Sequence, residues 1–433
     1  MPPDMTPLDH PIDVMILIHK AIRAEARMTR QAAEQLELGG NFKSFMPVFY
    51  RWAMALGHHE ETEYKYLIPY LPKTLPAQHN EVGHRELLDG LEDLQVCLHE
   101  ELGRMIVIPR TQRQLFGKVI NLLIAQADLL EEEEDVVLPV IRQQMSEAQQ
   151  LEISKRLLLD PDSEDERWML DWVAQHLSDA ERQVLAELVA RFDETSSPLS
   201  DWPAESPNTQ GARLISTTEC EIAVPVDPLS FDHPIDVMSL LHKALSIEAW
   251  RAETIAERLE IGEALQPFRQ AFNSWIKALS FHAEMEDLYM TPLLSDSPQA
   301  RENEDAHARL GQRVEAIQTY LQEIDHQTVT ARTRRRLFGK VVALRIDQDD
   351  HLEEEEEFVL PIIRDRMTTA QQLDIAAHLL LDPNAPDNNG VWVLDWLAQD
   401  LTDVERQSLA SLTVRFDKIG RQTAQKARGS HSR

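Results

Sequence analysis

A histidine and a glutamate four residues apart, with a proline ten residues after the histidine, occur three times in this chain of 433 residues. The copies are His59, Glu63 and Pro69; His282, Glu286 and Pro292; and His351, Glu355 and Pro361. On a helix, side chains four residues apart lie on one face, so both can reach the same metal ion. A fourth copy, at Glu133 and Pro139, has Leu129 at the histidine position. The spacing predicts metal-binding helices with one site damaged.

Most of the sequence occurs twice, which indicates two similar domains. DHPIDVMILIHKAIRAEA, from Asp9, returns as DHPIDVMSLLHKALSIEA, from Asp232, and RQLFGKVINLL, from Arg113, returns as RRLFGKVVALR, from Arg335. A period this long is typical of a duplicated domain, because solenoid repeats run about 20–50 residues. We predict domains at residues 1–195 and 229–420, a Ser/Pro-rich linker at 196–228 and a disordered tail at 421–433.

Apolar residues recur at helical spacing in both halves, and strand-like alternation is scarce. Four longer helical segments in each half predict an all-α protein of two tandem antiparallel four-helix bundles. Shorter helices are expected at the C-terminal end of each bundle. Four capping-box spacings mark their starts: Ser146 with Gln149, Ser178 with Glu181, Thr368 with Gln371, and Thr402 with Glu405.

Several histidines and glutamates fall on the apolar faces of these expected helices. A polar group buried without a partner costs about 1–3 kcal/mol, so several at one level must satisfy one another or bind something. Imidazole and carboxylate together suit iron, manganese or zinc, and helical bundles hold such ions between facing helices. The candidate ligands of the second half are His242, His282, Glu286, His307, His351 and Glu355. Four imidazoles and two carboxylates suit two ions bridged by Glu286 and Glu355, with positions left for water or dioxygen.

The first half has an incomplete set of the same residues. Its candidate ligands are His19, His59, Glu63, His84 and Glu133. Leu129 removes the histidine of the fourth helix, and the neighbouring Asp128 points about 100° away around that helix. A single metal, an asymmetric pair and an empty site all remain open. The acidic runs 131–134 and 353–357 are otherwise expected to be solvated helix face.

Bulk properties exclude several classes of protein. A net charge of −31 and a pI near 4.9 argue against binding nucleic acid or an anionic membrane. The two cysteines, Cys97 and Cys220, can build neither a disulfide framework nor a cysteine zinc site, which favours the cytoplasm. No apolar run reaches the roughly 18 residues of a membrane span, and the N-terminus lacks the features of a signal peptide.

On these residues both halves resemble the hemerythrin-like (HHE cation-binding) domains. The FGK, LEEEE and DW segments are most similar to the hemerythrin-like repeats of plant iron-sensing ubiquitin ligases. The resemblance implies a four-helix bundle with an oxygen-bridged, non-haem diiron centre that takes dioxygen as a ligand, held by the two residue sets above. Asn80 and Asn303 stand where the oxygen carriers have a further histidine, which favours the sensor and cation-binding branch. Two cysteines cannot build the zinc modules of the ligases, so ligase activity is not expected.

The sequence therefore predicts iron and dioxygen binding, used to sense or handle iron, oxygen or nitric oxide. Whether the protein is an enzyme stays open. The alternative is a diiron oxidase or oxygenase acting on a small organic substrate, which calls for an apolar cavity opening onto the metals. A third interpretation is a scaffold whose first domain has lost its metal and serves to contact a protein partner.

Overall fold

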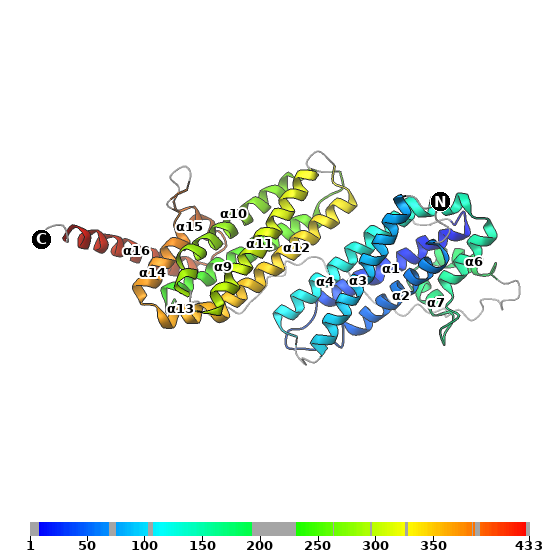
Figure 1. Ribbon diagram of the computed structural model, residues 1–433, viewed down its shortest axis with the longest axis horizontal. Coiled ribbons are helices and arrows are strands. Elements are labelled where there is room, and N and C mark those ends of the chain that lie inside the picture. The colour runs from blue at the N-terminus through cyan, green and yellow to red at the C-terminus, as the bar shows by residue number, and fades with distance from the viewer. Residues whose placement is uncertain are drawn as a thin grey trace. The chain divides into compact units, whose positions relative to one another are not determined.

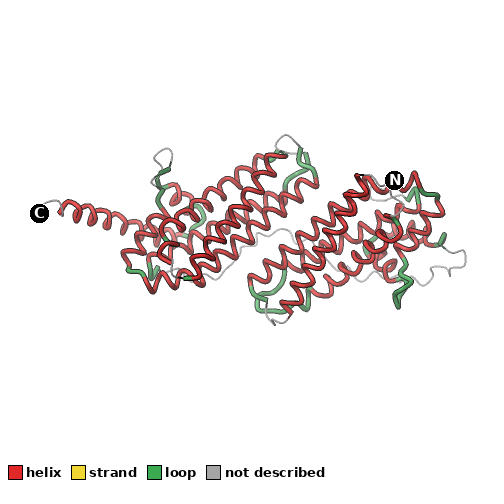
Figure 2. The backbone as a smooth tube through the Cα atoms, in the orientation of Figure 1, coloured by secondary structure: helices red, strands yellow, loops and turns green. Residues whose placement is uncertain are grey.

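The computed structural model describes residues 8–68, 75–102, 107–192, 231–262, 264–294, 297–324, 328–382, 384–385 and 390–429. Within these residues every regular element is a helix, which confirms the predicted all-α class (Figure 2). The chain divides into two compact units, residues 1–219 and 220–433. The expected linker, 196–228, lies outside the described residues. No described helix is both long and apolar enough to span a bilayer.

Unit 1 is built on four long helices (Figure 1). They are α1 (Val14–Glu34), α2 (Met46–Tyr66), α3 (Leu75–Leu102) and α4 (Pro109–Glu132). Helix α1 packs against α2 and α4, and α3 packs against the same two helices. Short connections between consecutive helices give the antiparallel, up-and-down arrangement of a four-helix bundle.

Unit 2 repeats this order of elements. Its long helices are α9 (Val237–Arg258), α10 (Gln266–Tyr289), α11 (Pro298–Glu323) and α12 (Ala331–Glu354). Helix α9 packs against α10 and α12, and α11 packs against the same two. In both units a tryptophan of the second helix donates its indole N–H to a buried glutamine of the fourth, at 2.6 Å: Trp52 to Gln126, and Trp275 to Gln348.

Shorter helices complete each unit. In unit 1 they are η1 (Pro11–Asp13), α5 (Leu138–Gln144), α6 (Glu147–Leu158), α7 (Trp168–Gln175) and α8 (Asp179–Val189). In unit 2 they are η4 (Pro234–Asp236), η5 (Thr291–Leu294), α13 (Leu360–Arg366), α14 (Thr369–Leu380) and α15 (Trp392–Leu397), and a long helix, α16 (Asp403–Gly429), follows them. All four predicted capping boxes are present at helix starts, with the Ser or Thr hydroxyl accepting from the backbone three residues on.

The C-terminus differs from expectation. Helix α16 continues to Gly429, past residue 420, where the sequence placed the start of a disordered tail. The segment is rich in Arg, Gln, Ala and Lys, which are good helix formers, so the helix passes through Gly420. Residues 430–433 lie outside the described part of the chain.

A wide π-helical turn follows the fourth long helix of each unit. These turns are η3 (Glu133–Val137) and η6 (Glu355–Val359), and each is followed by a proline, Pro139 or Pro361. A proline inside a helix has no N–H to donate, and its ring clashes with the carbonyl four residues earlier, so a locally wider turn relieves the conflict. Glu133 and Glu355 are the first residues of these turns. Helical periodicity in the sequence did not predict this turn.

An ion pair joins the trailing helices of unit 1 to the bundle. Lys20 of α1 donates to both carboxylate oxygens of Glu181, at 2.7 Å each, and Glu181 also caps α8 through Ser178. Burial alone would raise the pKa of Glu181, but the hydrogen bonds from Lys20 and Ser178 outweigh it and lower that pKa. Lys243 and Glu405 form the same pair in unit 2.

We expect Lys20→Met to lower the free energy of unfolding of unit 1 by about 1–2 kcal/mol near neutral pH. The pKa of Glu181 is lower in the folded protein than in the unfolded chain, where it is about 4.3. The ion pair therefore stabilises the fold above this pH, and the stabilisation is lost as the pH falls toward the pKa of the folded protein. Denaturant titrations near pH 7 and pH 3 should show the deficit shrinking in acid. Lys118→Met, which breaks an exposed pair with Asp93, is the control. A deficit independent of pH would contradict the account.

Candidate metal centres

Six polar side chains meet at one level inside unit 2. They are His242 from α9, His282 and Glu286 from α10, His307 from α11, His351 from α12 and Glu355 from η6. Their side chains are at most 7% exposed. The structure therefore brings together every residue that the sequence predicted for this half, and none lies apart.

Glu286 faces two histidines with its two oxygens. Its Oε1 lies 3.2 Å from His282 Nε2, and its Oε2 lies 3.2 Å from His307 Nε2. One oxygen therefore points toward the imidazoles of α9 and α10, and the other toward those of α11 and α12. This is the arrangement of a carboxylate that can bridge two ions.

Glu355 divides its oxygens in the same way. Its Oε2 lies 3.4 Å from His242 Nε2 and 3.9 Å from His282 Nε2, whereas its Oε1 lies 3.4 Å from His351 Nε2. Each pair of imidazoles thus shares one oxygen from each carboxylate, which makes two overlapping groups of four donors. We call them the α9/α10 position and the α11/α12 position.

The donor geometry fits metal ions. Ligand atoms about 2.0–2.2 Å from one ion lie roughly 3–3.5 Å from one another, close to the shorter separations found here. Within the described residues, the Nε2 atoms of all four histidines and all four carboxylate oxygens lack a hydrogen-bond partner, although they are buried. Buried polar atoms without partners are rare, and an ion at each position would satisfy them all at once.

Carboxylates outside the cluster hold the imidazoles in place. His242 Nδ1 lies 2.9 Å from a Glu356 oxygen, and His307 Nδ1 lies 2.8 Å from an Asp287 oxygen. In unit 1, His19 Nδ1 lies 2.8 Å from Glu134. An outer carboxylate that accepts the Nδ1–H leaves the Nε2 lone pair facing inward, as in many metal sites.

These outer residues were missed from the sequence. Glu134 and Glu356 belong to the acidic runs that were expected to be mostly solvated helix face; Glu356 is exposed and Glu134 is half-buried, but each also contacts an imidazole, which was not predicted. Their recurrence at equivalent places in the two halves was the available signal. Asn303, one of the two residues that replace a carrier histidine, is buried with its amide 3.4 Å from the Thr291 hydroxyl. The side chain of Asn80 lies outside the described residues.

The pKa values of the two central acids of unit 2 are shifted in opposite directions. Burial raises the pKa of Glu286, and the neighbouring Glu355 raises it further. Burial also disfavours the Glu355 anion, but His351 and His242 outweigh this effect and lower the pKa of Glu355. His242 would be neutral by burial alone, yet Glu355 and Glu356 raise its pKa to about 9. Divalent cations would allow both acids to ionise together.

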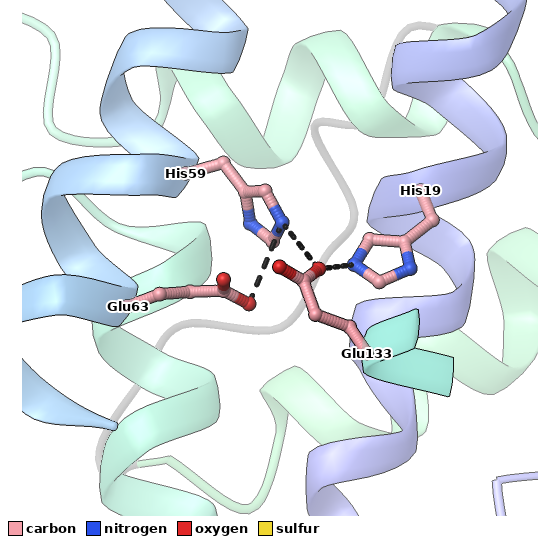
Figure 3. A group of neighbouring side chains, drawn as sticks. All are labelled: His19, His59, Glu63 and Glu133. Carbon is pink, nitrogen blue, oxygen red and sulfur yellow. Dashed lines mark ion pairs between the residues drawn. The ribbon is translucent and has the colours of Figure 1, made fainter. Parts of the chain in front are cut away.

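The described residues of unit 1 include one comparable group, which Figure 3 shows: His19, His59, Glu63 and Glu133. His19 Nε2 lies 3.2 Å from Glu133 Oε2, and His59 Nε2 lies 3.7 Å from the same oxygen. His59 Nε2 is 3.5 Å from Glu63 Oε1. These side chains are at most 1% exposed. By analogy with unit 2 we call this group the α1/α2 position.

His84, the fifth candidate of unit 1, also reaches the cluster. Its Nε2 lies 3.6 Å from Glu63 Oε2 and 3.7 Å from Glu133 Oε1. Its Nδ1 contacts Glu60, a buried acid that the sequence did not single out. We call the place where His84 meets Glu63 Oε2 and Glu133 Oε1 the α3/α4 position. Buried Leu129 stands where unit 2 has His351, so this position has one imidazole where unit 2 has two.

At neutral pH, Glu286→Gln should raise the free energy of unfolding of unit 2 in the metal-free protein, because burial and Glu355 raise the pKa of Glu286 and make its ionised form unfavourable in the folded state. Chemical denaturation in the presence of a chelator measures it. Glu284→Gln, at an exposed residue of the same helix, is the control and should change little. A destabilised Glu286→Gln protein would contradict this description of the site.

Comparison with known proteins agrees with the geometry. Residues 233–363 match the family model of the hemerythrin HHE cation binding domain. The matched segment runs from the start of α9 into α13 and includes all six cluster residues of unit 2. No curated protein and no solved structure gives a significant match. Residues 233–363 of unit 2 are therefore similar in sequence to the hemerythrin HHE cation binding domain.

Proposed function

We propose that unit 2 binds a pair of non-haem iron ions and that dioxygen or nitric oxide is the small ligand of this centre. The observation that carries the proposal is the division of oxygens by Glu286 and Glu355, each between two pairs of imidazoles. We further propose that the protein senses or handles iron, oxygen or nitric oxide, in the cytoplasm.

The donor count supports an iron pair rather than one zinc ion. Each position of unit 2 has two imidazole nitrogens and two carboxylate oxygens. Iron commonly accepts about six ligands, so each position would keep room for a small molecule, whereas about four donors close a structural zinc site. When bound, the iron would supply reversible redox and diatomic-ligand chemistry.

The surrounding residues keep the centre dry and fixed. One turn before His351, Gln348 is fully buried and accepts the indole N–H of Trp275, which closes the bundle on that side of the cluster. Leu279 and Leu352 are buried beside the ligands. Burial of this kind excludes water. The outer carboxylates of Glu356 and Asp287 hold the imidazole rings of His242 and His307 in a fixed orientation.

The alternative, an oxidase or oxygenase acting on an organic substrate, lacks a supporting observation. Such an enzyme needs an apolar cavity that opens onto the metals. A cavity of about 410 Å³ in unit 2 is lined by residues of α11 and by Lys340, and none of the six cluster residues lines it. The deeply buried donors favour a diatomic ligand over a larger one.

Anaerobic reconstitution with ferrous iron, desalting and Mössbauer spectroscopy tests this proposal. The protein should hold a magnetically coupled iron pair whose spectrum changes with dioxygen or nitric oxide. His351→Leu removes one of two imidazoles from the α11/α12 position and should abolish the coupled signal. Glu357→Gln, at an exposed residue of the same π turn, should retain it. A coupled pair that persists in the His351→Leu protein would refute the ligand assignment.

A further inference from the structure

We propose that unit 1 is a one-ion centre, which binds a single divalent cation at the α1/α2 position and has Leu129 in place of an imidazole at its second position. The inference rests on the proposed function only in taking the two positions of unit 2 as its reference. It is carried by contacts within unit 1.

The α1/α2 position is intact. The ring centroids of His19 and His59 are 5.1 Å apart, against 5.2 Å for His242 and His282 in unit 2. His19 Nε2, His59 Nε2, Glu63 Oε1 and Glu133 Oε2 have no hydrogen-bond partner in the described residues, although these side chains are buried. Four donors thus face one point with nothing else to satisfy them.

Arg23 strengthens the outer contact of His19. It donates to Glu134 at 2.7 Å, and the same Glu134 oxygen lies 2.8 Å from His19 Nδ1. Ser246 occupies the equivalent place in unit 2. The Arg23 guanidinium holds the Glu134 carboxylate against the His19 imidazole. The outer contact at the α1/α2 position of unit 1 is therefore at least as well supported as that at the α9/α10 position of unit 2.

Leu129 takes the place of an imidazole at the α3/α4 position, where His84 Nε2, Glu63 Oε2 and Glu133 Oε1 are buried without a hydrogen-bond partner in the described residues. Leu129 is 2% exposed, and a Cβ at Gly83 would lie only 3.0 Å from Leu129 Cδ1. The equivalent pair in unit 2 is His351 and Ala306. Glycine inside a helix costs about 1 kcal/mol relative to alanine, and here it makes the space that the leucine occupies. Gly83 and Leu129 thus differ from unit 2 together, because the smaller residue leaves room for the larger side chain.

Glu60 contacts His84, the histidine that remains at the α3/α4 position. It is 2% exposed, contacts His84 Nδ1 and stands where unit 2 has Ala283. In unit 2 the equivalent imidazole, His307, uses the exposed Asp287 instead. His84 is therefore tied to a buried acid, and the α3/α4 position has a single imidazole beside the oxygens of Glu63 and Glu133.

The donor set suits a divalent transition-metal ion. Two imidazoles with one oxygen from each of two carboxylates are the same donors that each position of unit 2 offers, and a tetrahedral zinc ion uses about four such ligands. Unit 1 would then take a divalent cation for stability, since an ion that binds only the folded state stabilises it. Zinc is the probe that tests this.

The experiment counts zinc bound to the metal-free, full-length chain by native mass spectrometry. Glu63→Ala should remove about one ion, both from the wild-type protein and from the Glu286→Ala variant, whose unit 2 is impaired. Glu61→Ala and Glu284→Ala alter exposed neighbours and should remove none. Loss of no ion, or of two, on Glu63→Ala overturns the one-ion centre. The Glu286→Ala variant alone measures how much zinc unit 2 binds. A failure of the ion pair proposed for unit 2 would therefore be seen separately from a failure of the one-ion centre in unit 1.

A gain of binding gives a second test that does not depend on damaging the site. Leu129→His combined with Gly83→Ala restores the residues of unit 2 and should raise the zinc count by about one. Gly83→Ala alone, whose added Cβ would meet Leu129 Cδ1, is the control and should leave the zinc count unchanged. Circular dichroism checks that each variant is folded. A folded double variant that binds no more zinc than wild type would contradict the claim that Leu129 closes the second position.

Discussion

The burial of two carboxylates at the centre of each bundle is the constraint on which the rest of the structure depends. Glu286 and Glu355, like Glu63 and Glu133, are almost inaccessible to water and lie beside several imidazoles. In each pair, one acid has a raised pKa and the other a lowered one. Protein groups alone leave these atoms unsatisfied, whereas divalent cations would neutralise both acids and use the facing nitrogens as ligands.

The helices of unit 2 are arranged around these buried carboxylates. Each long helix of unit 2 contributes at least one imidazole or carboxylate, and each central carboxylate reaches imidazoles from two pairs of helices. The π turn after α12 begins at Glu355 itself and absorbs Pro361, which a regular helix would not tolerate. Trailing helices brace the bundle from outside through pairs such as Lys243 with Glu405. Unit 1 keeps this frame and changes the contents of one position.

The fold and the inner donors could be predicted because their signals are local. A four-residue spacing puts His282 and Glu286 on one face of a helix whatever surrounds it, and apolar periodicity assigns that face to the core. The outer partners could not be predicted so directly. Glu356 follows a ligand in the sequence, and only the wide turn and the approach of α9 bring it to His242.

The same limit applies to the changes in unit 1. Gly83 is explained by its distance to Leu129, which lies on another helix, and no helical pattern reveals such a pair. Glu60 is one of several acids in its segment, and its burial becomes visible only when α3 brings His84 beside it. Tertiary contacts, rather than periodicity, therefore decide how many ions each unit can hold.

Anomalous X-ray diffraction from crystals of the full-length, metal-loaded protein tests the central claim most directly. Data collected at the absorption edge of the loaded metal should show two peaks between Glu286 and Glu355, and one in unit 1 between Glu63 and Glu133 on the side of His19. Peaks elsewhere, or a cluster in which protonated carboxyls and imidazoles hydrogen-bond to one another without metal, would contradict the account.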